Sequence, residues 1–143
     1  MLWTDLLIRF VLMAALTWMG IQDRRTREVS NALTIPMLIG GVIVVAFQLI
    51  ARDPFAVASI LIIALLTFAA LRGWMGGADW KVLVGLFGLW PLAGLASLTG
   101  AGLFGAGAIL WTGDRNASFP AIYIFAVSAL LTFFAEVSII TPN

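Results

Sequence analysis

About six long apolar runs follow one another along this chain and leave almost no polar stretch in which a soluble domain could fold. A helix that crosses a bilayer needs about 20 mostly apolar residues, because the hydrocarbon core is about 30 Å thick. Hydrophobic residues make up 62% of the chain and charged residues only 10%, whereas soluble domains carry roughly a quarter charged residues. The sequence therefore predicts an all-α, polytopic membrane protein with a single membrane-embedded domain over residues 1–143.

Short segments rich in charge and turn-forming residues separate the apolar runs. We expect about six transmembrane helices, the fifth of them short, at residues 2–21, 33–50, 54–71, 80–98, 99–111 and 119–140. The boundary between the fourth and fifth helices is expected in the barely polar stretch 97–100. The first run has no basic n-region and no A-x-A cleavage site, so we expect a mature helix there rather than a signal peptide.

The distribution of Lys and Arg predicts the orientation, because short cytoplasmic loops retain positive charge. If the N-terminus is outside, the basic residues on the cytoplasmic side are Arg24, Arg25, Arg27, Arg72, Lys81 and Arg115. Only Arg9 and Arg52 then lie elsewhere. We therefore expect an N-out, C-out protein of the plasma or inner membrane, with the lipid bilayer around it.

Cysteine and histidine are both absent. Their absence excludes a disulfide framework, a thiolate or imidazole metal site, and a Cys or His nucleophile or base. Any chemistry must come from Asp, Glu, Ser, Thr, Lys or a cofactor. Among the acids, Asp53 and Asp114 have the sequence context of exposed turn or cap residues. We expect Glu136, near the outer end of the last run, to reach the membrane interface; a buried partner is the alternative.

Asp23 and Asp79 are predicted to reach the same membrane face, because two full crossings separate them. Each also has a purely structural interpretation, which is favoured when the residue is taken singly. Asp23 could be an interfacial acid among arginines, and Asp79 could be the N-cap of the fourth helix.

Taken together, the two acids indicate a different chemistry. Two close carboxylates in a partly dry setting share a proton, so one can activate water while the other polarises a peptide carbonyl. Gly76, Gly77 and the small Ala78 would let a peptide or the first helix approach Asp79. Two acids at one face could equally bind a cation or relay protons.

Three stretches resemble type IV prepilin peptidases. Residues 23–38, DRRTREVSNALTIPML, resemble the segment in which an aspartate is followed by a basic linker, an Ile-Pro-Asn-like triplet and an apolar helix. Asn31 stands at the asparagine of that triplet. Residues 76–94, GGADWKVLVGLFGLWPLAG, resemble the Gly-x-Gly-Asp segment that continues with a hydrophobic residue and lysine. Residues 118–131, SFPAIYIFAVSALL, are similar to the start of the family's last helix.

The resemblance implies an aspartic endopeptidase that removes short basic leaders from prepilin-like precursors (pilin, pseudopilin or archaellin) at the cytoplasmic membrane face. It implies no cofactor, metal or nucleic-acid partner. Asp23 and Asp79 would be the catalytic pair, and Asn31, Gly76 and Lys81 match motif positions and would support it. The positive charge of Lys81 could favour the ionised form of a nearby carboxylate or attract an acidic group of the substrate. An equal alternative is that Lys81 faces the lipid headgroups.

Two positions depart from the family pattern, and neither removes a catalytic group. Ala78 replaces the second glycine of Gly-x-Gly-Asp, and Ser30 replaces the proline of the triplet. Larger members add a cysteine-rich segment and N-methylate the new N-terminus. A chain without cysteine resembles the compact forms that cleave without methylating, such as tight-adherence prepilin peptidases and archaeal preflagellin peptidases.

The alternative function is non-enzymatic: a catalytically inactive membrane scaffold or a small proton-linked transporter. A transporter would be expected to show internal repeats with broken helices at matching positions. No such repeat is evident in the sequence.

Overall fold

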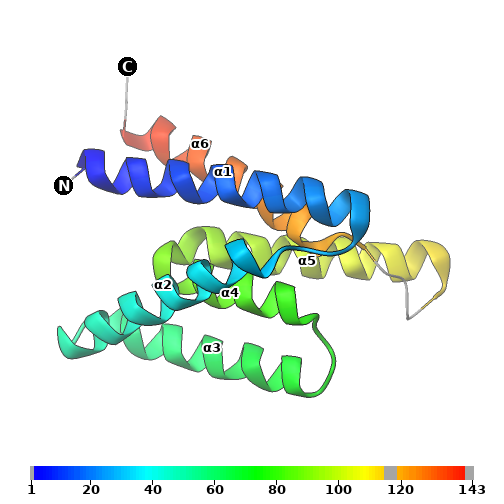
Figure 1. Cartoon of the computed structure of the whole chain (residues 1–143), viewed down its shortest axis with the longest axis horizontal. Coiled ribbons are helices and arrows are strands. Elements are labelled where there is room, and N and C mark those ends of the chain that lie inside the picture. The colour runs from blue at the N-terminus through cyan, green and yellow to red at the C-terminus, as the bar shows by residue number, and fades with distance from the viewer. Residues whose placement is uncertain (1, 115–118, 141–143) are drawn as a thin grey trace. The chain divides into compact units, whose positions relative to one another are not determined.

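The computed structural model describes residues 2–114 and 119–140, and all regular elements in these ranges are α-helices (Figure 1). The six helices are α1 (Leu2–Thr26), α2 (Asn31–Ile50), α3 (Pro54–Leu71), α4 (Gly77–Leu89), α5 (Pro91–Thr112) and α6 (Ala121–Ile140). The predicted all-α fold is confirmed, and the predicted bounds of the third helix agree with α3.

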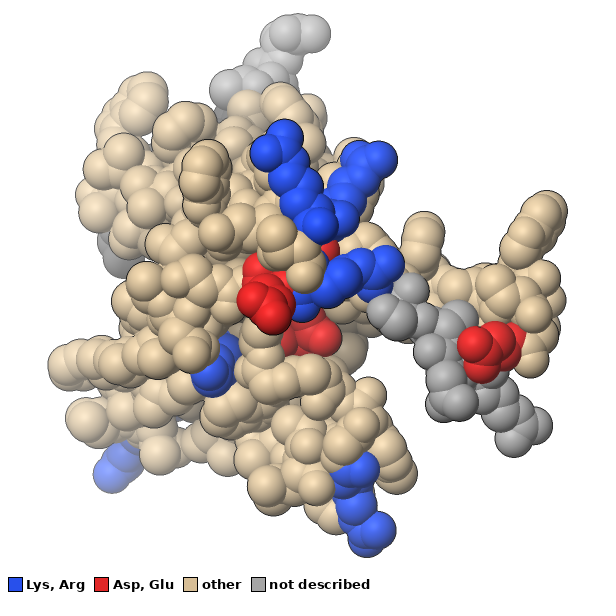
Figure 2. Space-filling model, turned by 45° about the vertical axis from the view of Figure 1, so that its right-hand side comes forward, with Lys and Arg blue, Asp and Glu red and all other residues tan. Residues whose placement is uncertain are grey.

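Five helices, α1, α2, α3, α5 and α6, are long and apolar enough to cross a membrane. The chain is therefore a multi-pass membrane protein. Figure 2 shows that uncharged side chains form most of the visible surface, as a lipid environment requires. With 13 residues, α4 rises about 20 Å at 1.5 Å per residue, which falls short of a hydrocarbon core of about 30 Å.

The boundary between the fourth and fifth helices was predicted wrongly. It lies at Trp90 and Pro91 rather than at 97–100, so the short helix is the fourth and not the fifth. Proline has no backbone N–H, and its ring disfavours a helical conformation in the preceding residue. Trp90 accordingly leaves the helix with φ −152° and ψ 79°, and Pro91 becomes the first residue of α5, a position that suits proline.

The chain divides into two compact units. The first unit contains residues 1–28 and 95–143, and in it α1 and α6 lie side by side (Figure 1). These two helices are antiparallel, because Asp23 contacts Ile122 near one end of the pair and Arg9 contacts Glu136 near the other.

The second unit contains residues 29–94, in which α4 packs against α2 and α3. A Cβ built on Gly88 would lie 2.2 Å from the carbonyl oxygen of Gly41, and one built on Gly85 would lie 2.7 Å from the Cγ of Met37. Small residues allow helix backbones to approach this closely. Since Lys81 contacts Asn31 at the start of α2 and Gly88 contacts Gly41 further along, the two helices run parallel. Their N-termini therefore lie at the same end of the unit.

Candidate active site

Asp23 lies near the C-terminal end of α1, and its side chain is buried, with 8% of its surface exposed. Its Oδ2 accepts a hydrogen bond of 3.0 Å from the backbone N–H of Ile122, the second residue of α6. The first N–H groups of a helix have no partner within the helix and favour a negative charge. Asp23 therefore caps α6 from another helix of the same unit, and its position at the membrane interface stays a prediction.

Asp79 is the third residue of α4, and the N-cap is Gly76. The N-cap interpretation of Asp79 is thus wrong, although its carboxylate does lie near the start of the helix. A Cβ built on Gly76 would lie 3.0 Å from Oδ2 of Asp79. The side chain of Asp79 folds back over the bare Cα of Gly76, so this glycine makes room for the carboxylate itself.

The other two small residues of the motif have different surroundings. No described atom lies within 4 Å of a Cβ built on Gly77, so the structure gives this glycine no packing requirement. Ala78 is the half-buried second residue of α4. Clearance for an approaching peptide stays a prediction for both positions.

Lys81 and Asn31, which the sequence could assign only as supports, contact each other. The Nζ of Lys81 donates a hydrogen bond of 2.7 Å to the Oδ1 of Asn31, the first residue of α2. Lys81 is half-buried and is directed at α2. Next to it, the indole Nε1 of Trp80 donates a 3.0 Å hydrogen bond to the hydroxyl of Thr67 in α3. The first turns of α4 are thus tied to both neighbouring helices of the unit.

The structure brings together two pairs among the predicted site residues: Gly76 with Asp79, and Asn31 with Lys81. Asp23 belongs to the first unit and Asp79 to the second, and their pairing stays a prediction. Within residues 2–114 and 119–140, no group of three Asp or Glu side chains is arranged to hold a metal ion.

Glu136 was predicted to reach the interface, and that expectation is wrong. Its carboxylate forms an ion pair with the guanidinium of Arg9, and the two side chains are 14% and 30% exposed. Sequence reasoning could not choose this partner, because Arg9 and Glu136 lie at opposite ends of the chain.

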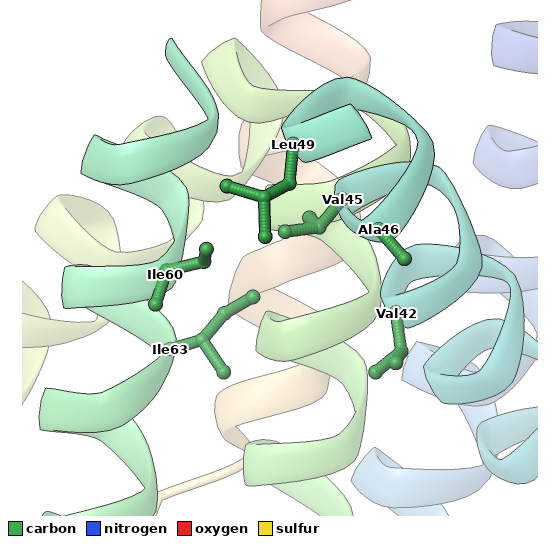
Figure 3. Close-up of a pocket in the computed structure, with 6 residues that line it drawn as sticks. All are labelled: Val42, Val45, Ala46, Leu49, Ile60 and Ile63. Carbon is green, nitrogen blue, oxygen red and sulfur yellow. The ribbon is translucent and has the colours of Figure 1, made fainter. Parts of the chain in front are cut away.

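A separate apolar hollow of about 280 Å³ lies between α2 and α3 (Figure 3). Its lining consists of Val42, Val45, Ala46, Leu49, Ile60 and Ile63. These aliphatic side chains supply no acid, base or nucleophile. This hollow therefore contributes nothing to the chemistry predicted for Asp23 and Asp79.

The model of the type IV leader peptidase family matches residues 10–137. No curated protein and no solved structure matches the chain. The matched region includes both aspartates, the Asn31–Lys81 contact and most of α6, the helix that Asp23 caps. Because the match covers most of its length, the chain belongs to the type IV leader peptidase family.

Proposed function

We propose that this protein is a membrane aspartic endopeptidase that removes the short basic leader from prepilin-like precursors, with Asp23 and Asp79 as its catalytic pair. Membership of a leader peptidase family supports peptidase activity on a protein substrate. With no His or Cys in the chain, carboxylates are the natural acid and base for peptide hydrolysis.

The hydrogen bond between Lys81 and Asn31 is the observation that carries the proposal. Asn31 follows Asp23 by eight residues in the sequence, and Lys81 follows Asp79 by two. The bond links the helical turn of Asp79 to the start of α2, the helix that comes directly after Asp23. This connection supports action of both aspartates at one membrane face.

The proposed reaction is hydrolysis of one peptide bond. The ionised carboxylate takes a proton from a water molecule, and the protonated carboxyl donates a hydrogen bond to the scissile carbonyl oxygen. The hydroxide adds to the carbonyl carbon, the C–N bond breaks, and the leaving nitrogen receives a proton. One water is consumed, and the products are the leader with a new carboxylate and the mature protein with a new amino group.

The surroundings of each carboxylate suit this role. The amide of Ile122 donates a hydrogen bond to Oδ2 of the buried Asp23, which restrains the orientation of the carboxylate. Gly76 lets the carboxylate of Asp79 lie back over the start of α4. Preorganisation of this kind lowers the reorganisation needed during the reaction.

We place the cleavage at the cytoplasmic face of the plasma or inner membrane, because most Lys and Arg residues gather on the segments assigned to that side. A precursor with an apolar helix would lie in the bilayer and present its leader junction at that interface. We also propose that the new N-terminus is left unmethylated, as in the compact members that this cysteine-free chain resembles.

The test uses the full chain co-expressed with a reporter precursor that carries a Lys- and Arg-rich leader ending in glycine, an apolar helix and a C-terminal tag. We expect leader removal by the wild type and none by Asp23→Asn or Asp79→Asn at equal membrane levels. Cleavage by either variant would overturn the catalytic pair. If the wild type left every such reporter intact, a scaffold or transporter function would replace the peptidase. Mass spectrometry of the mature reporter should find an unmodified amino terminus, and a methylated one would refute that part.

A further inference from the structure

We propose that Lys81 and Asn31 act together as a positioning pair that holds the catalytic turn of α4, the turn that carries Asp79, in its productive place. This inference rests on the proposed function, in which Asp79 takes part in catalysis. Neither residue is assigned contact with substrate. Their role is to fix where the carboxylate of Asp79 lies.

The start of α4 has little to hold it in place by itself. Its N-cap is Gly76, which makes no side-chain capping hydrogen bond. The loop before it contains Gly73 in a left-handed conformation, with φ +72°. The first N–H groups of any helix have no partner within it, and a glycine N-cap offers them no side-chain oxygen. Asp79 is the third residue of this helix and would move with it.

The remainder of α4 is held differently. Residues 82–88 are all buried, and Gly85 and Gly88 lie against α2 at backbone contact distance. A side chain inserted there would collide with the backbone, so this part of α4 has one closely packed position. Movement is therefore concentrated in the first turn, ahead of Val82.

The bond from Lys81 to Asn31 secures that first turn to α2. A charged donor makes a stronger hydrogen bond than a neutral one, and the 2.7 Å separation of Nζ and Oδ1 is short. The acceptor is itself anchored, because Ser30 caps α2 by accepting a hydrogen bond from the N–H of Ala32. The bond from Trp80 to Thr67 holds the turn to α3. Without the contact to α2, the turn is free to tilt and to carry the carboxylate of Asp79 with it.

Four variants test the pair with the tagged reporter precursor. Lys81→Met keeps the aliphatic stem and removes the donor, Asn31→Leu removes the acceptor at similar size, and a third variant combines both changes. We expect each to lower kcat by about tenfold, since misplacement of a catalytic group slows the chemical step. KM should stay unchanged, because a misplaced catalytic group weakens only the transition state. The double variant should be no slower than either single one.

The fourth variant, Asn31→Asp, is the rescue. It keeps an acceptor oxygen for Lys81, and its kcat should stay close to that of the wild type. Val45→Ala serves as the matched control for stability: Val45 is a buried α2 residue at the other end of the helix from Asn31. It should lower the melting temperature in detergent while leaving kcat of the folded enzyme unchanged.

The outcomes separate this inference from the proposed function. If Asp79→Asn is inactive but Lys81→Met and Asn31→Leu cleave with wild-type kcat, the positioning pair is refuted and the catalytic assignment stands. If the fold-losses in kcat of the two single variants multiply in the double variant, the residues act independently and the pair is likewise refuted. If Asp79→Asn cleaves normally, the proposed function itself fails.

Discussion

The Oδ2 of Asp23 lies 3.0 Å from the backbone nitrogen of Ile122, although 99 residues separate the two in the sequence. Through this contact a carboxylate on α1 caps the start of α6. The arrangement gives Asp23 a structural role beside the proposed catalytic one, and two substitutions can tell the roles apart.

Asp23→Asn keeps an oxygen that can accept the hydrogen bond from Ile122 but removes the carboxylate. We expect a melting temperature in detergent close to that of the wild type, together with complete loss of reporter cleavage. Asp23→Leu also removes the acceptor and leaves a buried N–H unsatisfied, which costs about 1–3 kcal/mol. Its melting temperature should therefore fall. If Asp23→Asn cleaved the reporter, Asp23 would serve only as a helix cap. If Asp23→Leu had the melting temperature of the wild type, the cap would contribute nothing to stability.

The two motif glycines should respond differently to alanine. In Gly76→Ala the new Cβ would lie 3.0 Å from Oδ2 of Asp79, so the carboxylate must shift. We expect kcat to fall by about tenfold to a hundredfold, the scale at which small misplacements of a catalytic group act. Gly77→Ala adds its Cβ to a position with no described atom within 4 Å, and cleavage should be nearly normal.

This comparison also decides between two reasons for the glycines. If they provide clearance for the substrate peptide, both alanine variants should raise KM. If Gly76 serves Asp79, only Gly76→Ala should be impaired, and the loss should appear in kcat. The measurement is steady-state cleavage of the reporter by purified enzyme in detergent.

The ion pair between Arg9 and Glu136 should stabilise the α1–α6 pair. Arg9→Met or Glu136→Gln leaves one partly buried charge without its partner, and we expect a loss of about 1–3 kcal/mol, less than for a fully buried pair. Exchanging the two charges, with Arg9→Glu and Glu136→Arg together, should recover part of that loss. Thermal unfolding of the wild type, Arg9→Met, Glu136→Gln and the variant that combines these two changes forms a double-mutant cycle. Additive effects would show that the pair contributes no coupling energy.

Gly88→Ala should disrupt the second unit. The added Cβ would lie 2.2 Å from the carbonyl oxygen of Gly41, and a backbone atom in a packed helix cannot move aside easily. We expect destabilisation of more than about 2 kcal/mol, or loss of the folded protein from membranes. Gly102→Ala is the matched control, because no described atom lies within 4 Å of its added Cβ. Equal stability of the two variants would contradict the close contact between α2 and α4.

Helix ends were predictable only where a local signal is strong. Asp53 and Pro54 give α3 an N-cap and a proline in its first turn, and the cap bond from the N–H of Phe55 to Asp53 is present. The same kind of signal, proline after Trp90, marks the end of α4, but the apolar run continues through it and hydropathy does not register the break. Length and hydropathy therefore predicted the number of helices better than their limits.

The candidate site was only partly accessible from the sequence. The motif indicated Asp79, Gly76, Asn31 and Lys81, but it gave no reason for their spacing. The structure supplies a reason within the second unit: Gly76 makes room for Asp79, and Lys81 bonds Asn31. Such contacts depend on which helix faces are adjacent, a property that no single segment contains.

The sequence by itself determined that this chain is a bundle of membrane helices, because a backbone in lipid must satisfy its own hydrogen bonds and long apolar runs can do so only as helices. It also determined which side chains can serve as acid or base, since carboxylates are present and cysteine and histidine are not. Only the tertiary structure decided which residues meet: Asp23 with the amide of Ile122, Arg9 with Glu136, and Lys81 with Asn31. The physical reason is that lipid and a protein interior are similarly apolar, so hydropathy cannot distinguish a face that packs on a helix from one that faces lipid.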